Sequence, residues 1–305
     1  MSFFHDFCRV HSIDLNANRP NVVGIGQPVV DTGINIDSEF VWEAVQPCRV
    51  TRHVGGSSLN TLRTLKYLGC SASFVSAIGQ DPEAHMVAKC LREEGIDTTM
   101  LRSMPEFACN QAYIISSSTR FEKTIFLHRQ SVDFGLEERD VDDIRKADVI
   151  HFNGYFNDFF TSALKHIDRD KTRISINCGL GPQSNDAFNA MKTANTVVAS
   201  RDFCAKYSSN GADECASHFF ASSEFAELFV VTSGAKGGQY FLKSGETCTF
   251  EANSAVVKNT TGAGDAFHAG VLFGQLYSLD PSEYFSLASW LGSRCCETDA
   301  PVFFL

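Results

Sequence analysis

The sequence predicts an α/β protein whose central, mostly parallel β-sheet is covered by helices on both faces. Short apolar runs, typical of strands buried on both sides, alternate along the chain with stretches of helical spacing, and this alternation is typical of parallel sheets. Two segments, 30–54 and 107–130, interrupt it with alternating strand patterns that predict a small second β-sheet. Residues 1–305 are treated as one domain, in which 1–20 form an N-terminal extension.

The strands of the central sheet are expected where short apolar runs occur. Helices are expected to follow them, and Asp81-Pro82 and Asp280-Pro281 each place a capping residue and a proline at a helix start. The phenylalanines of the extension are expected to dock it on the body of the protein. The six expected strands are Val22–Ile25, Ala72–Ala77, Val149–Phe152, Arg173–Asn177, Thr196–Ala199 and Leu228–Thr232.

Composition and charge narrow the class of protein. The 305 residues are 44% apolar, which is ample for a sizeable core, and their formal net charge of −10 without a basic cluster argues against a nucleic-acid surface. No segment approaches the ~20 apolar residues that span a membrane, and the first residues lack the pattern of a signal peptide. The 11 cysteines include no Cys-x-x-Cys pair, so we expect buried thiols in a reducing compartment. We therefore expect a cytoplasmic protein without nucleic-acid or membrane partners.

The segment Asn259-Thr-Thr-Gly-Ala-Gly-Asp-Ala-Phe-His-Ala-Gly270 joins a loop of small residues to an apolar run with helical spacing. Gly262, Ala263 and Gly264 let backbone N–H groups approach a bulky anion, and a helix N-terminus favours negative charge. Asp265 lies at the mouth of this loop, where a carboxylate suits a base that takes a proton from a hydroxyl as phosphate arrives. A helix cap is the alternative interpretation of Asp265, because aspartate is a favoured capping residue.

A second glycine-containing segment, His53-Val-Gly-Gly-Ser-Ser-Leu-Asn60, leads into an amphipathic helix. Leucines at a spacing of three give this helix one apolar stripe; Ser57 is expected to cap it and Gly69 to end it in left-handed geometry. Upstream, residues 21–31 predict a buried strand that leads to Asp31. A carboxylate there can accept hydrogen bonds from two neighbouring hydroxyls at once.

These three segments resemble the ribokinase-like superfamily, also called the PfkB carbohydrate kinases, which includes sugar kinases and adenosine kinase. The resemblance extends over about residues 21–298. It implies that Asp265 is the catalytic base. It also implies that the N–H groups of Gly262, Ala263 and Gly264 form the anion hole for the transferred phosphoryl group.

The resemblance further implies how the acceptor is bound. Asp31 and Asn60 would bind its hydroxyls, and Gly55 and Gly56 would let it lie against the backbone. The small β-sheet would be a lid that shuts out water, which competes with the acceptor for phosphate. Lids of this superfamily often pair, so the resemblance also implies a homodimer formed through the lid.

On the donor side, the resemblance implies that ATP is bound by a turn that follows a buried strand. Thr232, Gly234 and Gly237 lie in this turn, and Thr261 precedes the anion loop. A plain β-turn is the alternative interpretation of the turn. The chain lacks the Gly-x-x-x-x-Gly-Lys-Ser/Thr pattern, so it is not a P-loop enzyme.

Two departures from the family pattern concern metal ions. Mg²⁺ is implied because it neutralises charge on the transferred phosphate. The family's Asn-x-x-Glu reads Ala199-Ser-Arg-Asp202 here, which keeps the carboxylate of Asp202 as an indirect Mg²⁺ contact. The family's aspartate that helps to bind a monovalent cation is Asn259, which argues against potassium (K+) activation.

The predicted activity is in-line phosphoryl transfer from Mg·ATP to a hydroxymethyl group of a small sugar. Segment 123–128 resembles ketohexokinases and favours a sugar. Segments 26–31 and 154–156 resemble adenosine kinase, in which an aromatic residue such as Phe156 stacks on the purine, so a nucleoside acceptor is the alternative. A non-catalytic ligand-binding protein on the same fold is a further alternative, motivated by changed positions such as Asn259.

Overall fold

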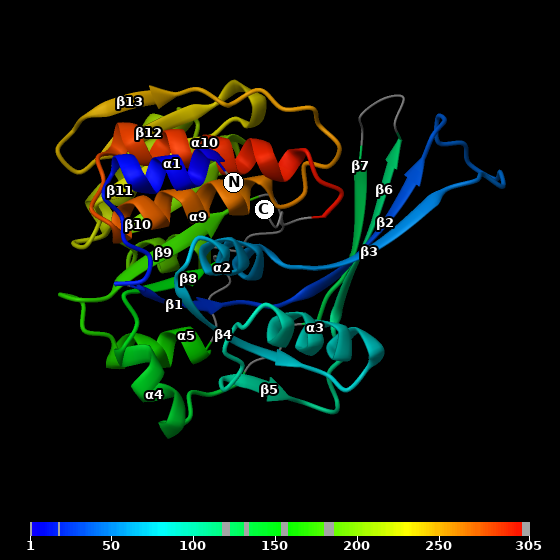
Figure 1. Ribbon diagram of the computed structural model, residues 1–305, viewed down its shortest axis with the longest axis horizontal. Helices are drawn as coiled ribbons and strands as arrows, with labels where there is room; N and C mark the ends of the chain where they lie inside the picture. The colour runs from blue at the N-terminus through cyan, green and yellow to red at the C-terminus, as the bar shows by residue number, and fades with distance from the viewer. Residues whose placement is uncertain are drawn as a thin grey trace.

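The computed structural model describes residues 2–17, 19–117, 123–130, 134–153, 158–179 and 186–300. They form a nine-stranded sheet and a separate four-stranded sheet. Figure 1 shows helices on both sides of the larger sheet, and the four-stranded sheet projecting away from it. The predicted α/β architecture is therefore confirmed, together with its small second sheet.

The larger sheet has the order β13-β12-β11-β10-β9-β8-β1-β4-β5. Neighbouring strands from β11 to β5 are parallel, and the β11–β12 and β12–β13 pairs at one edge are antiparallel. All six predicted strands are present, whereas β5, β12 and β13 were not predicted. The strands are β1 (Asn21–Ile25), β4 (Ser71–Ile78), β5 (Leu101–Ser103), β8 (Val149–Phe152), β9 (Arg173–Cys178), β10 (Thr196–Ser200), β11 (Leu228–Thr232), β12 (Gly238–Leu242) and β13 (Thr247–Phe250).

Helices cover both faces of this sheet. Side chains of α4 to α8 form one core with one face of the strands, and α1 to α3 with α9 and α10 form the core on the other face. The first group comprises α4 (Glu138–Arg145), α5 (Asp158–Ala163), α6 (Asp186–Met191), α7 (Arg201–Tyr207) and α8 (Ala212–Ser222). The second comprises α1 (Ser2–Val10), α2 (Ser57–Tyr67), α3 (Pro82–Glu93), α9 (Ala263–Leu276) and α10 (Pro281–Cys296). Two short 3-10 helices occur at Leu164–His166 and Gly234–Lys236.

Helix α2 is the predicted amphipathic helix. Its leucine stripe is fully buried, and Gly69 follows its end with φ +100°. The prediction that Ser57 caps it was wrong: Gly56 is the N-cap, and Ser57 is the first helical residue. Gly56 has φ +111°, and a Cβ there would lie 2.6 Å from the carbonyl oxygen of Gln27, so only glycine fits.

Helices α9 and α10 pack closely because glycines of α9 face α10. A Cβ at Gly270 would lie 2.5 Å from Cα of Ala288, and one at Gly274 would lie 2.0 Å from Cβ of Tyr284. The predicted start of α10 is confirmed by a capping box around Asp280. This close packing places the end of α10 beside the loop that leads into α9.

Helix α1 lies in the predicted N-terminal extension, where no helix was assigned. Phe4 and Phe7 are buried in the core beside α9 and α10, and Phe3 stacks on Trp290 with ring centroids 4.8 Å apart. The expectation that phenylalanines dock the extension on the body of the protein is therefore confirmed.

The four-stranded sheet, called the small sheet below, has the order β3-β2-β6-β7. Its strands β2 and β6 are parallel, and its two outer pairs are antiparallel. Apolar side chains are exposed on both of its faces, with Phe126 55% and Leu127 46% exposed. The strands are β2 (Val29–Ile36), β3 (Arg49–Gly55), β6 (Asn110–Ser117) and β7 (Lys123–His128).

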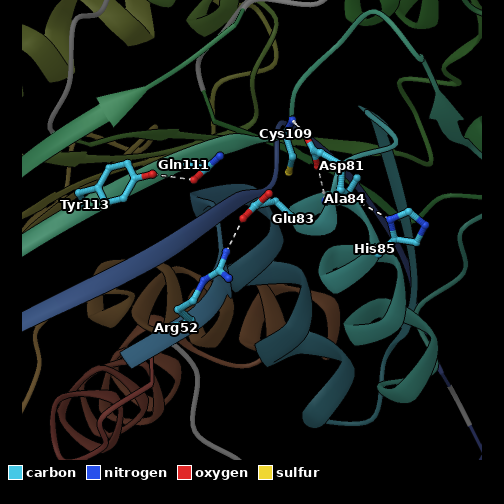
Figure 2. Close-up of polar contacts among 8 residues, drawn as sticks. All are labelled: Arg52, Asp81, Glu83, Ala84, His85, Cys109, Gln111 and Tyr113. Carbon is cyan, nitrogen blue, oxygen red and sulfur yellow. Dashed lines mark hydrogen bonds and ion pairs between the residues drawn. The ribbon is translucent and has the colours of Figure 1, made fainter. Parts of the chain in front are cut away.

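The small sheet is attached to helix α3 by polar contacts (Figure 2). Asp81 caps α3 by accepting a 2.7 Å hydrogen bond from the Ala84 N–H, as its sequence position predicted. Its other carboxylate oxygen accepts a 2.7 Å bond from the N–H of Cys109, directly before β6. Arg52 of β3 pairs with Glu83 of α3 at 2.5 Å. One helix N-terminus therefore holds two strands of the small sheet.

Two further expectations concern cysteines and membranes. All eleven cysteines are free thiols and seven are buried, as expected. Among the described residues, none of the helices combines the length and the apolar character needed to cross a bilayer.

Candidate active site

Asp265 lies in the first turn of α9 and is partly buried. Its carboxylate accepts three hydrogen bonds, from Ser57 Oγ at 2.8 Å, Asn60 Nδ2 at 3.0 Å and Asn177 Nδ2 at 3.1 Å. These donors come from α2 and from the carboxyl end of β9, so three elements converge on one carboxylate. The N-cap of α9 is Gly262, and the alternative interpretation of Asp265 as that cap was wrong.

This environment shifts the pKa of the Asp265 carboxyl group towards neutral pH. Burial raises the pKa of Asp265 from 3.8 to about 6, and the hydrogen bonds from Asn60, Ser57 and Asn177 act in the opposite direction. Burial disfavours the charged form, whereas donors to a carboxylate favour it. The result is a carboxylate that is ionised at pH 7 and that accepts a proton more readily than an ordinary aspartate.

The predicted anion loop is positioned by the end of α10. The carbonyl oxygen of Cys296 accepts hydrogen bonds from the N–H groups of Lys258 at 2.8 Å and Asn259 at 3.2 Å. Gly262, with φ +83°, then turns the chain into α9. N–H groups of a first helical turn have no carbonyl partner within their own helix. The segment 262–265 therefore lies at a helix N-terminus, where the dipole favours an anion; the N–H of Ala263 also donates to the carbonyl oxygen of Thr260 at 3.4 Å, and the anion hole stays a prediction.

A cavity of about 160 Å³ lies beside the base, and we call it the Arg129 cavity. Ser57 and Asn177, both bonded to Asp265, line one part of it, together with Gly56. Arg129, which follows β7, and Asn110, at the start of β6, also line it. The cavity is therefore bounded by the large sheet, by α2 and by the small sheet.

Asp31 lies elsewhere. It lines a second cavity of about 290 Å³, together with His53, Thr260 and Thr261. It packs against Gly55, where a Cβ would lie 2.3 Å from its Oδ2. The four predicted acceptor residues are therefore divided between two places. Asn60 contacts the base and Gly56 lines the Arg129 cavity, whereas Asp31 and Gly55 lie beside the second cavity.

The two cavities lie under the same face of the small sheet. Val29 lines the Arg129 cavity and Asp31 the second one. These residues are two apart on β2, and side chains two apart along a strand project from the same face. One molecular surface thus spans both cavities.

The predicted nucleotide turn follows β11. Gly234 and Gly237 have φ +58° and +72°, and a Cβ at Gly237 would lie 2.0 Å from the carbonyl oxygen of Phe250. Thr232 Oγ1 donates to the carbonyl oxygen of Ala199 at 3.3 Å. A third cavity, of about 720 Å³, is lined by neighbours of these residues, including Ser233 and Lys236. The glycines are needed for the turn itself, and the turn borders a cavity large enough for a nucleotide.

The metal predictions concern Asp202 and Asn259. Asp202 is exposed in the first turn of α7, directly after β10. The described residues contain no group of three or more His, Cys, Asp or Glu that could hold a metal ion. Mg²⁺ commonly keeps several waters and uses one or two carboxylates plus substrate phosphates, so a single exposed carboxylate fits such an ion. Asn259 is hydrogen-bonded within the protein: its Nδ2 donates to the carbonyl oxygen of Asp299 at 3.2 Å, and its Oδ1 accepts from the N–H of Thr261 at 2.9 Å.

Ser57 and Asn177 are site residues that the sequence analysis did not assign. Asn177 was expected only as the last residue of a strand, although polar side chains at the carboxyl ends of parallel strands are the general place for ligand sites. Residues 154–156, including Phe156, lie outside the described residues, as does part of the predicted lid at 118–122.

Comparison with solved structures supports the class of fold. Arabidopsis thaliana ribokinase complexed with ribose and ATP superposes with a TM-score of 0.77 at 16% identity, over 93% of this chain and 94% of that one. Xylella fastidiosa fructokinase with bound ATP gives a TM-score of 0.75, also at 16% identity, over 92% and 93%. The fold is therefore that of the ribokinase-like proteins.

The family follows from the sequence. The model for the pfkB family carbohydrate kinases matches residues 33–302, which is most of the chain. A 5-dehydro-2-deoxygluconokinase of Shouchella clausii (strain KSM-K16) is 26% identical over 294 residues, covering 88% of each chain. Fructokinase-2 of Oryza sativa subsp. japonica is 27% identical over 236 residues, or 72% of this chain and 69% of that protein. The chain belongs to the PfkB family of ATP-dependent carbohydrate kinases.

Proposed function

We propose that this kinase transfers the terminal phosphoryl group of Mg·ATP in line to a hydroxymethyl group of a small sugar, with Asp265 as the base. The observation that carries the proposal is the Asp265 carboxylate, whose pKa is about 6 and which three converging donors hold beside a cavity. The carboxylate takes the proton of the hydroxyl as the phosphoryl group arrives. The negative charge of the transferred phosphoryl group is stabilised by the N–H groups of Gly262, Ala263, Gly264 and Asp265.

The acceptor lies in the Arg129 cavity, against Gly56. Asn60 does not line this cavity: it is almost fully buried and donates to Asp265, and its Oδ1, which has no hydrogen-bond partner among the described residues, would accept from a hydroxyl that reaches the base. Asp31 and Gly55 extend the site under the small sheet. A volume of about 160 Å³ is below the roughly 300–1,000 Å³ of pockets for drug-sized ligands, which favours a sugar over a nucleoside. The names of the relatives favour a sugar as well.

The nucleotide occupies the third cavity, beside the turn that contains Thr232, Gly234 and Gly237. Thr261, the other predicted nucleotide contact, lines the second cavity with Asp31. Mg²⁺, when bound with ATP, neutralises charge on the transferred phosphate, and Asp202 would help to hold it through water. Asn259 supplies no charge for a monovalent cation, so we expect no potassium requirement. The non-catalytic alternative is not retained, because the family is one of kinases.

The small sheet acts as a lid that closes over the acceptor and excludes water. Its attachment through a few polar contacts at α3 supports this role. Val50 and Phe126, more than half exposed, lie on the face of the small sheet opposite Asp31, and we propose that this face pairs with a second copy of the chain. A cytoplasmic location is part of the same proposal.

Replacing Asp265 with Asn tests the base. We expect kcat to fall by about 10²–10⁴-fold, the usual contribution of general-base catalysis, while ATP affinity measured by calorimetry stays near that of the wild type. Asp142→Asn, at an exposed position of α4, is the matched control and should retain full turnover. Acceptors to be compared are fructose, ribose and adenosine. Near-normal turnover of Asp265→Asn would refute the assignment, and a preference for adenosine would favour the nucleoside alternative.

A further inference from the structure

We propose that His268 is a positioning residue for the base: its hydrogen bond with Ser175 fixes helix α9 on strand β9 in the register at which Asn177 reaches Asp265. The inference rests on the proposed function, because it takes Asp265 to be the base. His268 belongs to a buried cluster of polar side chains that the proposed reaction does not use.

The cluster consists of His151, Ser175 and His268, which are completely or almost completely buried. Ser175 Oγ is hydrogen-bonded to Nε2 of His268 at 2.7 Å and to Nδ1 of His151 at 3.3 Å. The two imidazole rings meet edge to face, with centroids 4.6 Å apart. The other ring nitrogen of each histidine has no hydrogen-bond partner among the described residues. The Ser175 hydroxyl is therefore the polar partner that both imidazoles share.

This environment keeps both imidazoles neutral. Burial lowers the pKa of His151 to about 3, and burial together with the neighbouring His151 lowers the pKa of His268 well below its usual value. Because a hydroxyl has one proton, Ser175 donates to one imidazole and accepts from the N–H of the other. The contact is thus a pair of hydrogen bonds between neutral groups, and it persists over the pH range in which Asp265 titrates.

The cluster lies beside the base because helix α9 packs along strand β9. Asp265 and His268 are three apart on the helix and share a face of it. Asn177 and Ser175 are two apart on the strand and share a face of the sheet. Asp265 is bonded to Asn177 at 3.1 Å, and His268 to Ser175 at 2.7 Å. The two bonds are successive contacts between the same helix and the same strand.

A third contact continues the series, since Arg173 Nη1 donates to the carbonyl oxygen of Gln275 at 3.4 Å. As the residue numbers on α9 rise from 265 through 268 to 275, those of their partners on β9 fall from 177 through 175 to 173. The helix therefore runs antiparallel to the strand. Of the three polar contacts that set its register, the one made by His268 is the shortest.

The position of the base depends on this register. Apolar packing alone tolerates small shifts, whereas a buried polar network favours one arrangement. A shift of about 0.5 Å would lengthen the bond between Asn177 and Asp265 to about 3.6 Å, which is no longer a hydrogen bond. The carboxylate would then lose a donor and move relative to the acceptor, and a misplacement of about 1 Å can cost about 10²-fold in rate.

Three variants test the assignment. His268→Leu removes the imidazole at similar volume, Ser175→Ala removes the shared hydroxyl, and His268→Gln keeps a nitrogen donor near the place of Nε2. We expect kcat of the first two to fall by roughly 10- to 100-fold, with the KM for ATP nearly unchanged, and His268→Gln to recover most of the loss. If His268→Leu does not fold, the other two variants carry the comparison.

Ser76→Ala is the matched control for Ser175→Ala. It removes a buried hydroxyl from β4, where Ser76 Oγ donates to the carbonyl oxygen of Ala77 at 3.3 Å. This contact lies within one strand and does not involve α9. We therefore expect Ser76→Ala to leave kcat unchanged.

The pKa of Asp265, measured by ¹³C NMR of its carboxyl group, is the readout that a loss of stability alone would not move. In His268→Leu and Ser175→Ala this pKa should rise, because the Asn177 donor favours the ionised form and is lost. In an Asn177→Ala background the same changes should raise it no further, since effects that act through one contact are not additive.

The outcomes separate this inference from the proposed function. An Asp265 pKa that stays the same in the folded variants, or that rises equally with and without Asn177, would overturn the positioning role of His268 and leave the base in place. Near-normal turnover of Asp265→Asn would overturn the base instead, and the NMR comparison would still decide whether His268 positions this carboxylate.

Discussion

The two sheets of this protein contrast in how they are held. The large sheet is covered on both faces, and residues such as Val23 and Phe74 in its strands are completely buried. The small sheet exposes large apolar side chains on both faces, including Phe126 and Leu127. Regions with few buried apolar contacts open locally at low free-energy cost, so the small sheet is the less stable of the two.

This difference separates two tasks of the site. The donors that hold Asp265 come from α2 and β9, which belong to the buried part of the fold. Arg129, by contrast, directly follows β7 of the small sheet. The geometry of the base is thus fixed by the buried core, whereas one wall of the Arg129 cavity belongs to the part of the fold that is less firmly held. The predictions below test this division, beginning with the largest expected effect.

The contacts that join the small sheet to the rest of the protein differ in burial, and we expect the buried ones to contribute most to stability. Arg63 of α2 is 7% exposed, bonds to Glu94, and donates to the carbonyl oxygen of Val54 at the end of β3. Glu94→Gln would leave this cation without its counter-charge, and breaking a buried pair in this way costs about 3–5 kcal/mol. We expect a loss of about 3 kcal/mol in urea unfolding, because Glu94 keeps slight exposure. Glu93→Gln, at an exposed neighbour, should cost less than about 0.5 kcal/mol.

The packing of α9 against α10, which supports the anion loop, should show the next largest effect on stability when it is disturbed. Gly274→Ala would place a methyl group 2.0 Å from Cβ of Tyr284, and overpacking of this kind costs about 1–3 kcal/mol. Gly135→Ala is the matched control, because a Cβ there would meet no atom within 4 Å. Chemical denaturation of both variants measures the difference. Equal stability of the two would show that α9 and α10 are not tightly packed.

The pH dependence of turnover reports on the base directly. Since the pKa of Asp265 is about 6, kcat/KM should fall as the pH drops through 6 and be roughly tenfold below its plateau at pH 5. Asn177→Ala removes a donor that favours the ionised form, so this limb should move to higher pH. The raised pKa also means that the native state binds more protons than the unfolded chain between about pH 4 and 6. The contribution of Asp265 to stability therefore declines as the pH rises through this range. A limb that stays in place in Asn177→Ala would contradict the assigned hydrogen bond.

The smallest effect on stability is expected at the exposed contact between the small sheet and helix α3. Arg52 is 46% exposed in its pair with Glu83, and exposed pairs are typically worth about 0.2–1 kcal/mol. A double-mutant cycle with Arg52→Gln and Glu83→Gln measures this coupling in the free energy of unfolding. A coupling above about 2 kcal/mol would mean that the small sheet is held as firmly as the large one, and would remove the proposed division.

The sequence analysis succeeded where local signals decide the structure. Apolar runs located the six strands in the interior of the large sheet, and the capping residues Asp81 and Asp280 located helix starts. The edge strands β12 and β13 escaped the sequence analysis. Strand β12 is a short run that follows a glycine turn, although its Tyr240 and Phe241 are buried, and β13 alternates threonine with apolar residues at partly exposed positions. Residues 259–265 were assigned correctly to a glycine loop at a helix N-terminus, since that motif is contiguous in the chain.

The site was less predictable where it depends on contacts that are distant in sequence. Ser57 was expected to cap its own helix, but its hydroxyl donates to Asp265, 208 positions away. Asn177 could be recognised as the end of a strand but not as a partner of the base. Asp31 followed the family pattern, but its side chain lines the second cavity rather than the Arg129 cavity. Which cavity a side chain enters depends on how the two sheets meet, and no local pattern records that.

Three neutral donors, rather than a cationic side chain, hold the Asp265 carboxylate. Attraction between full charges weakens as dissolved ions accumulate, since they screen it over about 8–10 Å at physiological ionic strength. Dehydration by surrounding protein and short contacts to hydroxyl and amide groups are hardly affected by added salt. The affinity of this carboxylate for a proton should therefore stay nearly constant from dilute buffer to concentrated electrolyte.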